Sequence, residues 1–147
     1  MTGTPTKNLA QVAEAVITAF NAGDWPQFRA PLASDVVYEE TGTQRRTQSA
    51  DEYVQLVQGW KQAFPDVQGT IRNVVSSGNT VVQEITWVGT QTGPLPGPGG
   101  TLPASGKQIT VQASLWYTFQ GDTIQEVHHY LDVLSMLQQL GALPAAG

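Results

Sequence analysis

The chain has 147 residues and a formal net charge of −5, and 40% of its residues are hydrophobic while only 13% are charged. This length fits one domain, over residues 1–147, that buries about two thirds of the surface of its unfolded form. The low content of Lys and Arg, without a basic run, argues against nucleic acid or an anionic membrane as a partner, and the absence of cysteine excludes disulfides, thiolate nucleophiles and cysteine-ligated metals.

The N-terminal stretch "MTGTPTKN" lacks a following apolar region of the kind that export signals carry. No apolar run is long enough to span a membrane. We therefore expect a cytoplasmic protein that has no membrane contact. We also expect residues 1–7 and 144–147 to be flexible.

Three helices are predicted in the first half of the chain. Apolar residues from Leu9 to Phe20 recur at helical spacing and end at Gly23, and Asp24 is a suitable N-cap for a short second helix. Ser49 and Glu52 have the spacing of a capping box, which predicts a third helix that Pro65 ends.

Strands are predicted at "DVVYEE" and in the second half of the chain, over residues 67–76, 79–91, 108–120 and 123–132. The turn sequences "SSGN" and "QGDT" join successive strands of this second group, which should form a meander. Residues 93–106 are rich in Gly and Pro, so we expect a long loop without regular structure, of the kind that covers pockets. Helices followed by strands predict an α+β fold with a segregated sheet.

Two phrases resemble the SnoaL-like polyketide cyclases of the NTF2-like superfamily. "GWKQAFPDVQGTIRNVVSSGNTVVQEITWVGTQTGPLPG" is similar to a stretch of that family that runs from a helix into a hairpin, and "IQEVHHYLDVLSMLQQLG" is similar to its terminal strand and helix. The resemblance implies an NTF2-like cone, in which a curved antiparallel sheet wraps around N-terminal helices and encloses a hydrophobic pocket. It also implies a homodimer that needs neither metal nor organic cofactor.

In these cyclases an aspartate near the end of the last strand acts as acid and base in an intramolecular aldol closure. The resemblance places that residue at Asp132, and it places a second family residue, a histidine, at or near Thr118. Threonine does not titrate near neutral pH, so the two-residue site of the family is not reproduced here. A simpler reading of Asp132 is that it caps the helix that follows.

Strand alternation puts Glu126, His128, Tyr130 and Asp132 on one face of the last strand, and we interpret this polar face as the pocket wall. His128 would then orient Asp132 or protonate an enolate, or it would simply hydrogen-bond at the core edge. His129 should point away, toward solvent or a dimer interface. The adjacent histidines diverge and have no third ligand nearby, so no metal site is predicted.

Further pocket candidates come from the neighbouring strands and from the helices. Alternation groups Ser114, Trp116 and Thr118, while Glu84 lies either in the pocket or on the open face of the sheet. The aromatic residues Trp60, Phe64, Tyr53 and Tyr38 belong either to the core or to a pocket shaped for a flat ligand.

The leading functional hypothesis is a cofactor-independent enzyme that abstracts a proton from a small hydrophobic carbonyl compound and so catalyses aldol cyclisation or isomerisation. Asp132 would be the base. His128, Tyr130 and Thr118 would polarise the carbonyl. The alternatives are a pocket that binds a small hydrophobic ligand without turnover, an activity like that of epoxide hydrolases, and a dimeric scaffold whose outer sheet face binds proteins.

Overall fold

The computed structural model describes residues 7–97 and 100–143 of the chain. The predicted flexibility of residues 1–7 and 144–147 therefore lies outside the described residues, except at Lys7. The main-chain N–H of Lys7 donates to Asp122 at 3.0 Å.

The predicted helices form, with the predicted capping residues. Helix α1 (Leu9–Ala22) begins after Asn8, whose side chain accepts from a main-chain N–H of the first turn, and ends at Gly23, which has a left-handed φ of 69°. Helix α2 (Trp25–Arg29) is capped by Asp24, and α3 (Ala50–Ala63) by Ser49. A fourth helix, α4 (Val133–Gln139), follows the last strand directly.

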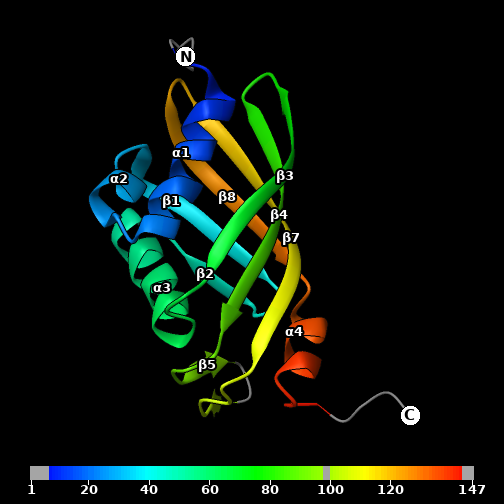
Figure 1. Cartoon of the computed structure of the whole chain (residues 1–147). Coiled ribbons are helices and arrows are strands. Elements are labelled where there is room, and N and C mark those ends of the chain that lie inside the picture. The colour runs from blue at the N-terminus through cyan, green and yellow to red at the C-terminus, as the bar shows by residue number, and fades with distance from the viewer. Residues whose placement is uncertain (1–6, 98–99, 144–147) are drawn as a thin grey trace.

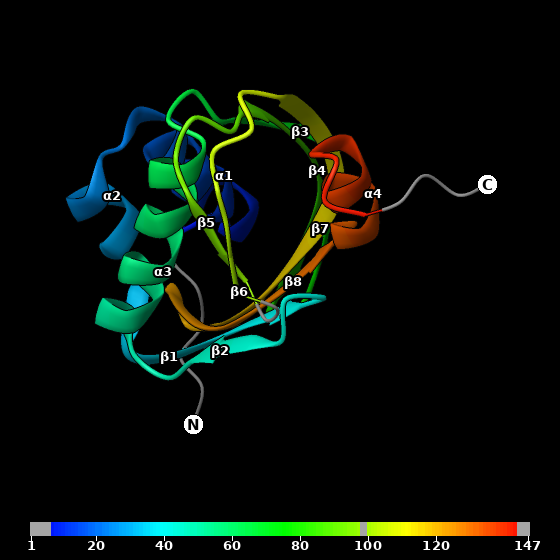
Figure 2. The ribbon, with the colours of Figure 1, turned by 90° about the horizontal axis from the view of Figure 1, so that it is seen from below.

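The main sheet has six strands in the order β2-β1-β8-β7-β4-β3. They are β1 (Leu32–Thr41), β2 (Arg45–Thr47), β3 (Gln68–Ser77), β4 (Thr80–Thr90), β7 (Gln108–Gln120) and β8 (Thr123–Leu131). The predicted meander is confirmed as β3, β4, β7 and β8, and β1 joins it in parallel with β8. The sheet curves around helices α1 to α3 (Figures 1 and 2), which confirms the α+β cone.

The prediction that residues 93–106 lack regular structure is wrong. Strands β5 (Leu95–Gly97) and β6 (Gly100–Leu102) form a small antiparallel pair within this segment. The buried side chain of Gln91 stabilises it, because its Nε2 donates to the carbonyl oxygens of Gly93, Leu102 and Pro103 at 3.2, 3.3 and 3.2 Å. Each strand of this ribbon has a partner on one side only, so both are edge strands. Edge strands tolerate proline, whereas a central strand does not.

The register of the sheet sets which side chains share a row on its inner face. Gln83 of β4 lies opposite Leu115 of β7, Leu115 lies opposite His129 of β8, and His129 lies beside Glu40 of β1. All four side chains are buried. This row of the inner face therefore brings three polar side chains into an otherwise apolar interior.

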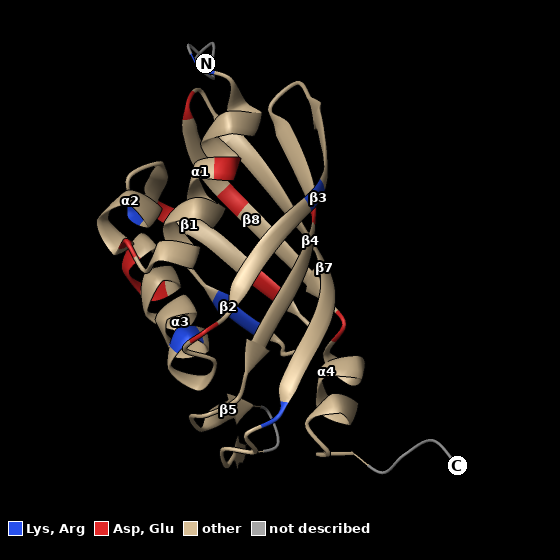
Figure 3. Ribbon diagram, viewed as in Figure 1, with Lys and Arg blue, Asp and Glu red and all other residues tan. Residues whose placement is uncertain are grey.

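Charged residues are sparse on the ribbon, and β2, at one edge of the sheet, begins with the adjacent basic residues Arg45 and Arg46 (Figure 3). No helix among the described residues is long and apolar enough to cross a membrane. Within the same ranges, no three His, Asp or Glu side chains are grouped as ligands for a metal ion.

Candidate active site

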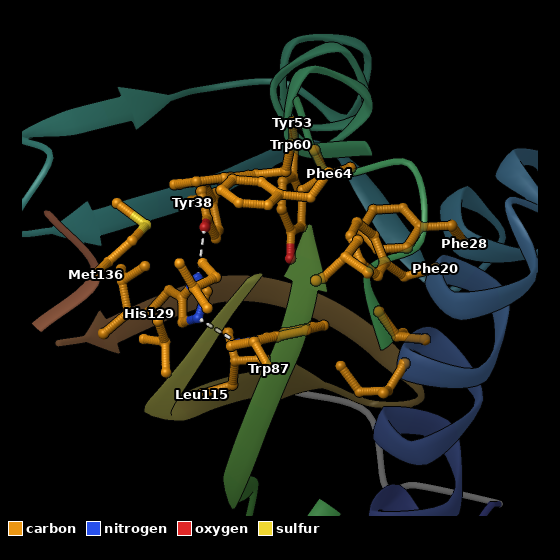
Figure 4. A pocket seen from close by; sticks show the side chains of 18 residues that line it. Phe20, Phe28, Tyr38, Tyr53, Trp60, Phe64, Trp87, Leu115, His129 and Met136 are labelled. Carbon is orange, nitrogen blue, oxygen red and sulfur yellow. Dashed lines mark hydrogen bonds between the residues drawn. The ribbon is translucent and has the colours of Figure 1, made fainter. Parts of the chain in front are cut away.

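A pocket lies between the helices and the inner face of the sheet. Its volume is about 700 Å³ when its opening to solvent is counted. Figure 4 shows aromatic and aliphatic side chains around it, with His129 on the wall formed by the sheet. The lining residues are Val16, Ile17, Phe20, Phe28, Tyr38, Tyr53, Val57, Trp60, Phe64, Val67, Trp87, Gly89, Ile109, Val111, Leu115, His129, Leu131 and Met136.

The imidazole of His129 is the titratable group at the centre of this wall. Its Nδ1 lies 2.8 Å from the hydroxyl of Tyr38, and its Nε2 accepts a hydrogen bond of 3.3 Å from the indole N–H of Trp87. Only 7% of His129 is exposed. Trp87 can reach His129 because the facing residue on β3 is Gly69, where a Cβ atom would lie 2.5 Å from the Trp87 ring.

The carboxylate of Glu40 binds the other end of this network. Tyr38 donates to its Oε2 at 2.6 Å, and the indole N–H of Trp60 donates to the same oxygen at 2.8 Å. Thr43 and Arg45 donate to Oε1 at 2.5 and 2.8 Å. The Glu40 side chain is fully buried, whereas Arg45 is partly exposed, so the ion pair connects the interior to the surface beside β2.

Burial and these neighbours set the protonation states. Burial acts to raise the pKa of the Glu40 carboxyl, but Arg45, the hydrogen bonds from Thr43 and Tyr38, and the charge of His129 once it is protonated at low pH outweigh burial and lower that pKa below its ordinary value. Burial lowers the pKa of His129 to about 4, although the Glu40 carboxylate acts in the opposite direction. At neutral pH the pocket wall therefore presents a neutral imidazole, backed by a buried carboxylate.

The predicted pocket face of β8 is wrong. His129 and Leu131 line the pocket, whereas His128 and Tyr130 are on the outer face, where their rings stack. His128 pairs there with Glu126 at 2.6 Å and with Glu39 at 3.4 Å. The pocket is apolar, so the more apolar of the two alternating sets faces inward.

Asp132 is the N-cap of α4, as the simpler reading of the sequence predicted. It is exposed, and its carboxylate accepts from the main-chain N–H of Ser135 at 3.0 Å. Its neighbour in the chain, Leu131, lines the pocket, as does Met136 of α4. Asp132 is thus not among the lining residues, and its catalytic role stays a prediction.

The same inversion holds on β7, and the structure decides the position of Glu84 on β4. Ser114, Trp116 and Thr118, expected in the pocket, alternate with the buried Leu115 and Tyr117 and are absent from the lining. Glu84 takes the second of its two predicted positions, because it is exposed on the outer face and accepts from Asn73 of β3 at 3.2 Å.

For the four aromatic residues expected either in the core or in a pocket, the structure gives the second position, since Tyr38, Tyr53, Trp60 and Phe64 all line the pocket. Tyr38 and Tyr53 stack with ring centroids 4.2 Å apart. Sequence reasoning missed His129, Trp87 and Glu40. The signal that could have found His129 was the apolar character of its neighbours Val127 and Leu131, which share its face.

Comparison with known proteins identifies the family of this chain. The family model described as SnoaL-like polyketide cyclase matches residues 10–140. The chain belongs to this family. A search of curated proteins found no match.

Solved structures similar to this SnoaL-like protein share its fold at low sequence identity. IdmH from Streptomyces antibioticus, a proposed polyketide cyclase, is 22% identical with a TM-score of 0.78, over 92% of this chain and 99% of that one. An epoxide hydrolase of the LEH-like type from M. tuberculosis is 18% identical with a TM-score of 0.69, over 91% and 90%. A Catenulispora acidiphila protein with a ketosteroid isomerase-like fold is 19% identical with a TM-score of 0.75, over 99% and 98%.

Proposed function

We propose that this SnoaL-like protein is a cofactor-independent enzyme that moves a proton at a carbon atom beside the carbonyl group of a hydrophobic compound, with aldol cyclisation or isomerisation as the outcome. The observation that carries the proposal is His129, a neutral imidazole on the wall of an apolar pocket with a buried carboxylate behind it. The family match and the sparse polar lining support the same class of substrate.

The proposed base is the Nε2 lone pair of His129. The C–H bond of the substrate breaks, its proton forms an N–H bond at Nε2, and the electron pair remains as an enolate. Tyr38 and the Glu40 carboxylate lie on the far side of the ring and stabilise the positive charge that develops there.

Trp87 would provide the second polar contact. For Nε2 to take the proton, the indole N–H must first leave its lone pair and turn to the carbonyl oxygen of the substrate, to which it then donates as the enolate forms. In an aldol closure the enolate carbon attacks a second carbonyl of the same molecule, and the resulting alkoxide takes the proton back from Nε2. Asp132, the base expected from the sequence, is the alternative proton acceptor at the end of β8.

The test is proton exchange at the activated CH₂ of 2-tetralone in D₂O, followed by NMR. We expect the protein to accelerate exchange, and we expect His129→Leu to lose roughly 100-fold or more of that rate. Asp132→Asn is the matched control, because asparagine caps helices as well as aspartate and removes only the carboxylate. Retained exchange in Asp132→Asn supports His129. Exchange lost in Asp132→Asn and kept in His129→Leu assigns the base to Asp132 and contradicts the proposal.

The second candidate is binding without turnover. It is favoured by the partners that both nitrogens of His129 already have within the chain. Binding of 2-tetralone without acceleration of exchange would support this candidate over the enzyme. Opening of an added epoxide to a diol would instead point to an activity like that of epoxide hydrolases.

We also propose that the chain forms a homodimer. Trp116 and Tyr130 on the outer face of the sheet are each 46% exposed, and aromatic residues exposed together mark contact surfaces. Sedimentation equilibrium should give twice the monomer mass, and Trp116→Gln should shift the protein toward monomer. A monomer at all concentrations would contradict this proposal.

A further inference from the structure

The hydrogen bonds around His129 determine where its proton lies. The indole N–H of Trp87 is a donor only, so the Nε2 that it contacts must carry a lone pair. On the other side, Glu40 is a carboxylate and accepts only, so the single hydroxyl hydrogen of Tyr38 points to Glu40. The Tyr38 oxygen is then free to accept, and Nδ1 of His129 must donate to it.

The contacts at the two nitrogens are independent of each other, and both require the imidazole to carry its hydrogen on Nδ1. The free side chain of histidine carries no such constraint, because either nitrogen can hold the proton. The constraint at Nε2 comes from Trp87 of β4, and the constraint at Nδ1 comes from Tyr38 and Glu40 of β1, which are separated from His129 by about ninety residues of chain. Their pairing with β8 is what puts the three side chains together.

The groups that hold Glu40 make this arrangement rigid. Thr43, Arg45 and Trp60 all donate to its carboxylate, which is buried. These donors stabilise the ionised carboxylate and fix its orientation. The carboxylate in turn fixes the direction in which the Tyr38 hydroxyl donates.

The tautomer of His129 determines which hydrogen-bonding group a ligand must carry. With its hydrogen committed to Tyr38, His129 offers the pocket an acceptor and no donor. The remaining lining is almost entirely hydrocarbon, apart from aromatic polar tips such as the hydroxyl of Tyr53, which Figure 4 shows directed toward the cavity. The one lone pair of Nε2 is occupied by the Trp87 N–H, so a ligand that uses Nε2 must displace that N–H and bring an acidic hydrogen of its own. A hydroxyl meets both needs, because its hydrogen can donate to Nε2 while its oxygen accepts from the displaced Trp87 N–H.

We propose that Tyr38 and Glu40 are positioning residues that hold His129 as the Nδ1–H tautomer, and that the pocket selects a flat apolar ligand carrying one enol or phenol hydroxyl for Nε2. The ligand class rests on the proposed function, because an enol is the neutral form of the enolate made there. The tautomer does not rest on it. The two parts can therefore fail separately.

The tautomer is tested by long-range ¹H–¹⁵N NMR of protein labelled with ¹⁵N-histidine, which is simple to assign because the chain has only two histidines. In the native protein at neutral pH we expect His129 to show a protonated Nδ1 and an unprotonated Nε2. Tyr38→Phe removes the acceptor of the Nδ1 hydrogen and leaves the Trp87 contact at Nε2. In this variant the Nε2–H tautomer should gain population without replacing the Nδ1–H form. An Nε2–H tautomer or an imidazolium in the native protein would overturn the proposal even if no variant folded.

Glu126→Gln is the matched control, because Glu126 contacts the other histidine, His128, on the outer face. It should alter the His128 signals and leave those of His129 unchanged. Glu40→Gln keeps the shape of the side chain and can still accept from Tyr38, so it should keep the Nδ1–H tautomer better than Glu40→Leu. Equal effects of Gln and Leu at this position would contradict the positioning role.

The ligand class is tested with 2-naphthol and 2-methoxynaphthalene, which share a ring system and differ in the hydroxyl hydrogen. We expect 2-naphthol to bind at least about 10-fold more tightly and to shift the Nε2 resonance of His129, and we expect His129→Leu to abolish the difference. Equal affinity of the two probes would overturn this part of the proposal. Preference for 2-naphthol without any 2-tetralone exchange would leave the inference standing and refute the proposed catalysis.

Discussion

The low pKa of His129 should make the protein less stable in mildly acidic solution. The unfolded chain has an ordinary histidine with a pKa of about 6.5, whereas the folded chain holds this group neutral down to about pH 4. Between these values the unfolded state binds more protons, so the free energy of unfolding falls as the pH falls. The stabilising contribution is complete above about pH 6.5 and is lost by about pH 4.

The size of the effect follows from the shift. Each pKa unit corresponds to about 1.4 kcal/mol, so the full shift contributes about 3 kcal/mol. Between about pH 7 and about pH 5 the loss is about 2 kcal/mol, and most carboxyl groups remain ionised over that interval. A loss of this size is a large fraction of the stability of a single domain.

The assay is urea unfolding followed by tryptophan fluorescence at these two pH values. His128→Gln retains His129 and should keep the loss of stability, whereas His129→Leu should remove it. A direct NMR titration of His129 gives a second measurement that needs no variant. Stability that does not change between the two pH values, or a His129 that titrates at its ordinary pKa, would refute the reasoning.

Further predictions concern single positions. Both side-chain polar atoms of the buried Gln83 lack a hydrogen-bond partner in the described chain, so Gln83→Met should raise the free energy of unfolding by about 1–3 kcal/mol, and a loss measured by urea unfolding would contradict this. Gly59→Ala, in helix α3 with open space around it, should stabilise by about 0.5–1 kcal/mol. In contrast, a Cβ at Gly93 would lie 2.2 Å from the carbonyl oxygen of Gln62, so Gly93→Ala should lower the thermal midpoint; equal midpoints for the two variants would contradict this packing. Asp132→Ala should cost about 1 kcal/mol through loss of the cap, and Asp132→Asn should cost nearly nothing in the same assay.

Local signals in the sequence were sufficient for most elements. Ser49 with Glu52, Asp24 and Gly23 each predicted a helix end that the structure contains, because capping depends on atoms only a few residues apart. The strands of the meander followed from alternation and from turn residues. The β5–β6 ribbon was missed because its stability comes from Gln91, which lies outside the ribbon and binds across it.

The sequence left the inward-facing side of each strand in the candidate site undecided. Alternation in "VHHYLD" separates His128 from His129 with certainty, but it does not say which of the two faces inward. The polar set of this strand suggests a pocket wall, whereas the pocket is apolar and holds a single imidazole. Helical spacing predicted that Trp60 and Phe64 face the interior, but it left open whether they belong to the core or to a pocket, and the structure places both on the pocket lining.

The sequence by itself thus determined the helices, the meander, the resemblance to SnoaL-like proteins and the capping role open to Asp132, since all of these rest on neighbouring residues or on patterns along one segment. Only the tertiary structure decided that His129 faces the pocket and that Tyr38 and Glu40 stand behind it. The parallel pairing of β1 with β8 joins residues that are far apart in the chain. Burial strengthens the hydrogen bonds of that network and shifts the pKa of His129, and no pattern along a single segment indicates how deeply these residues are buried.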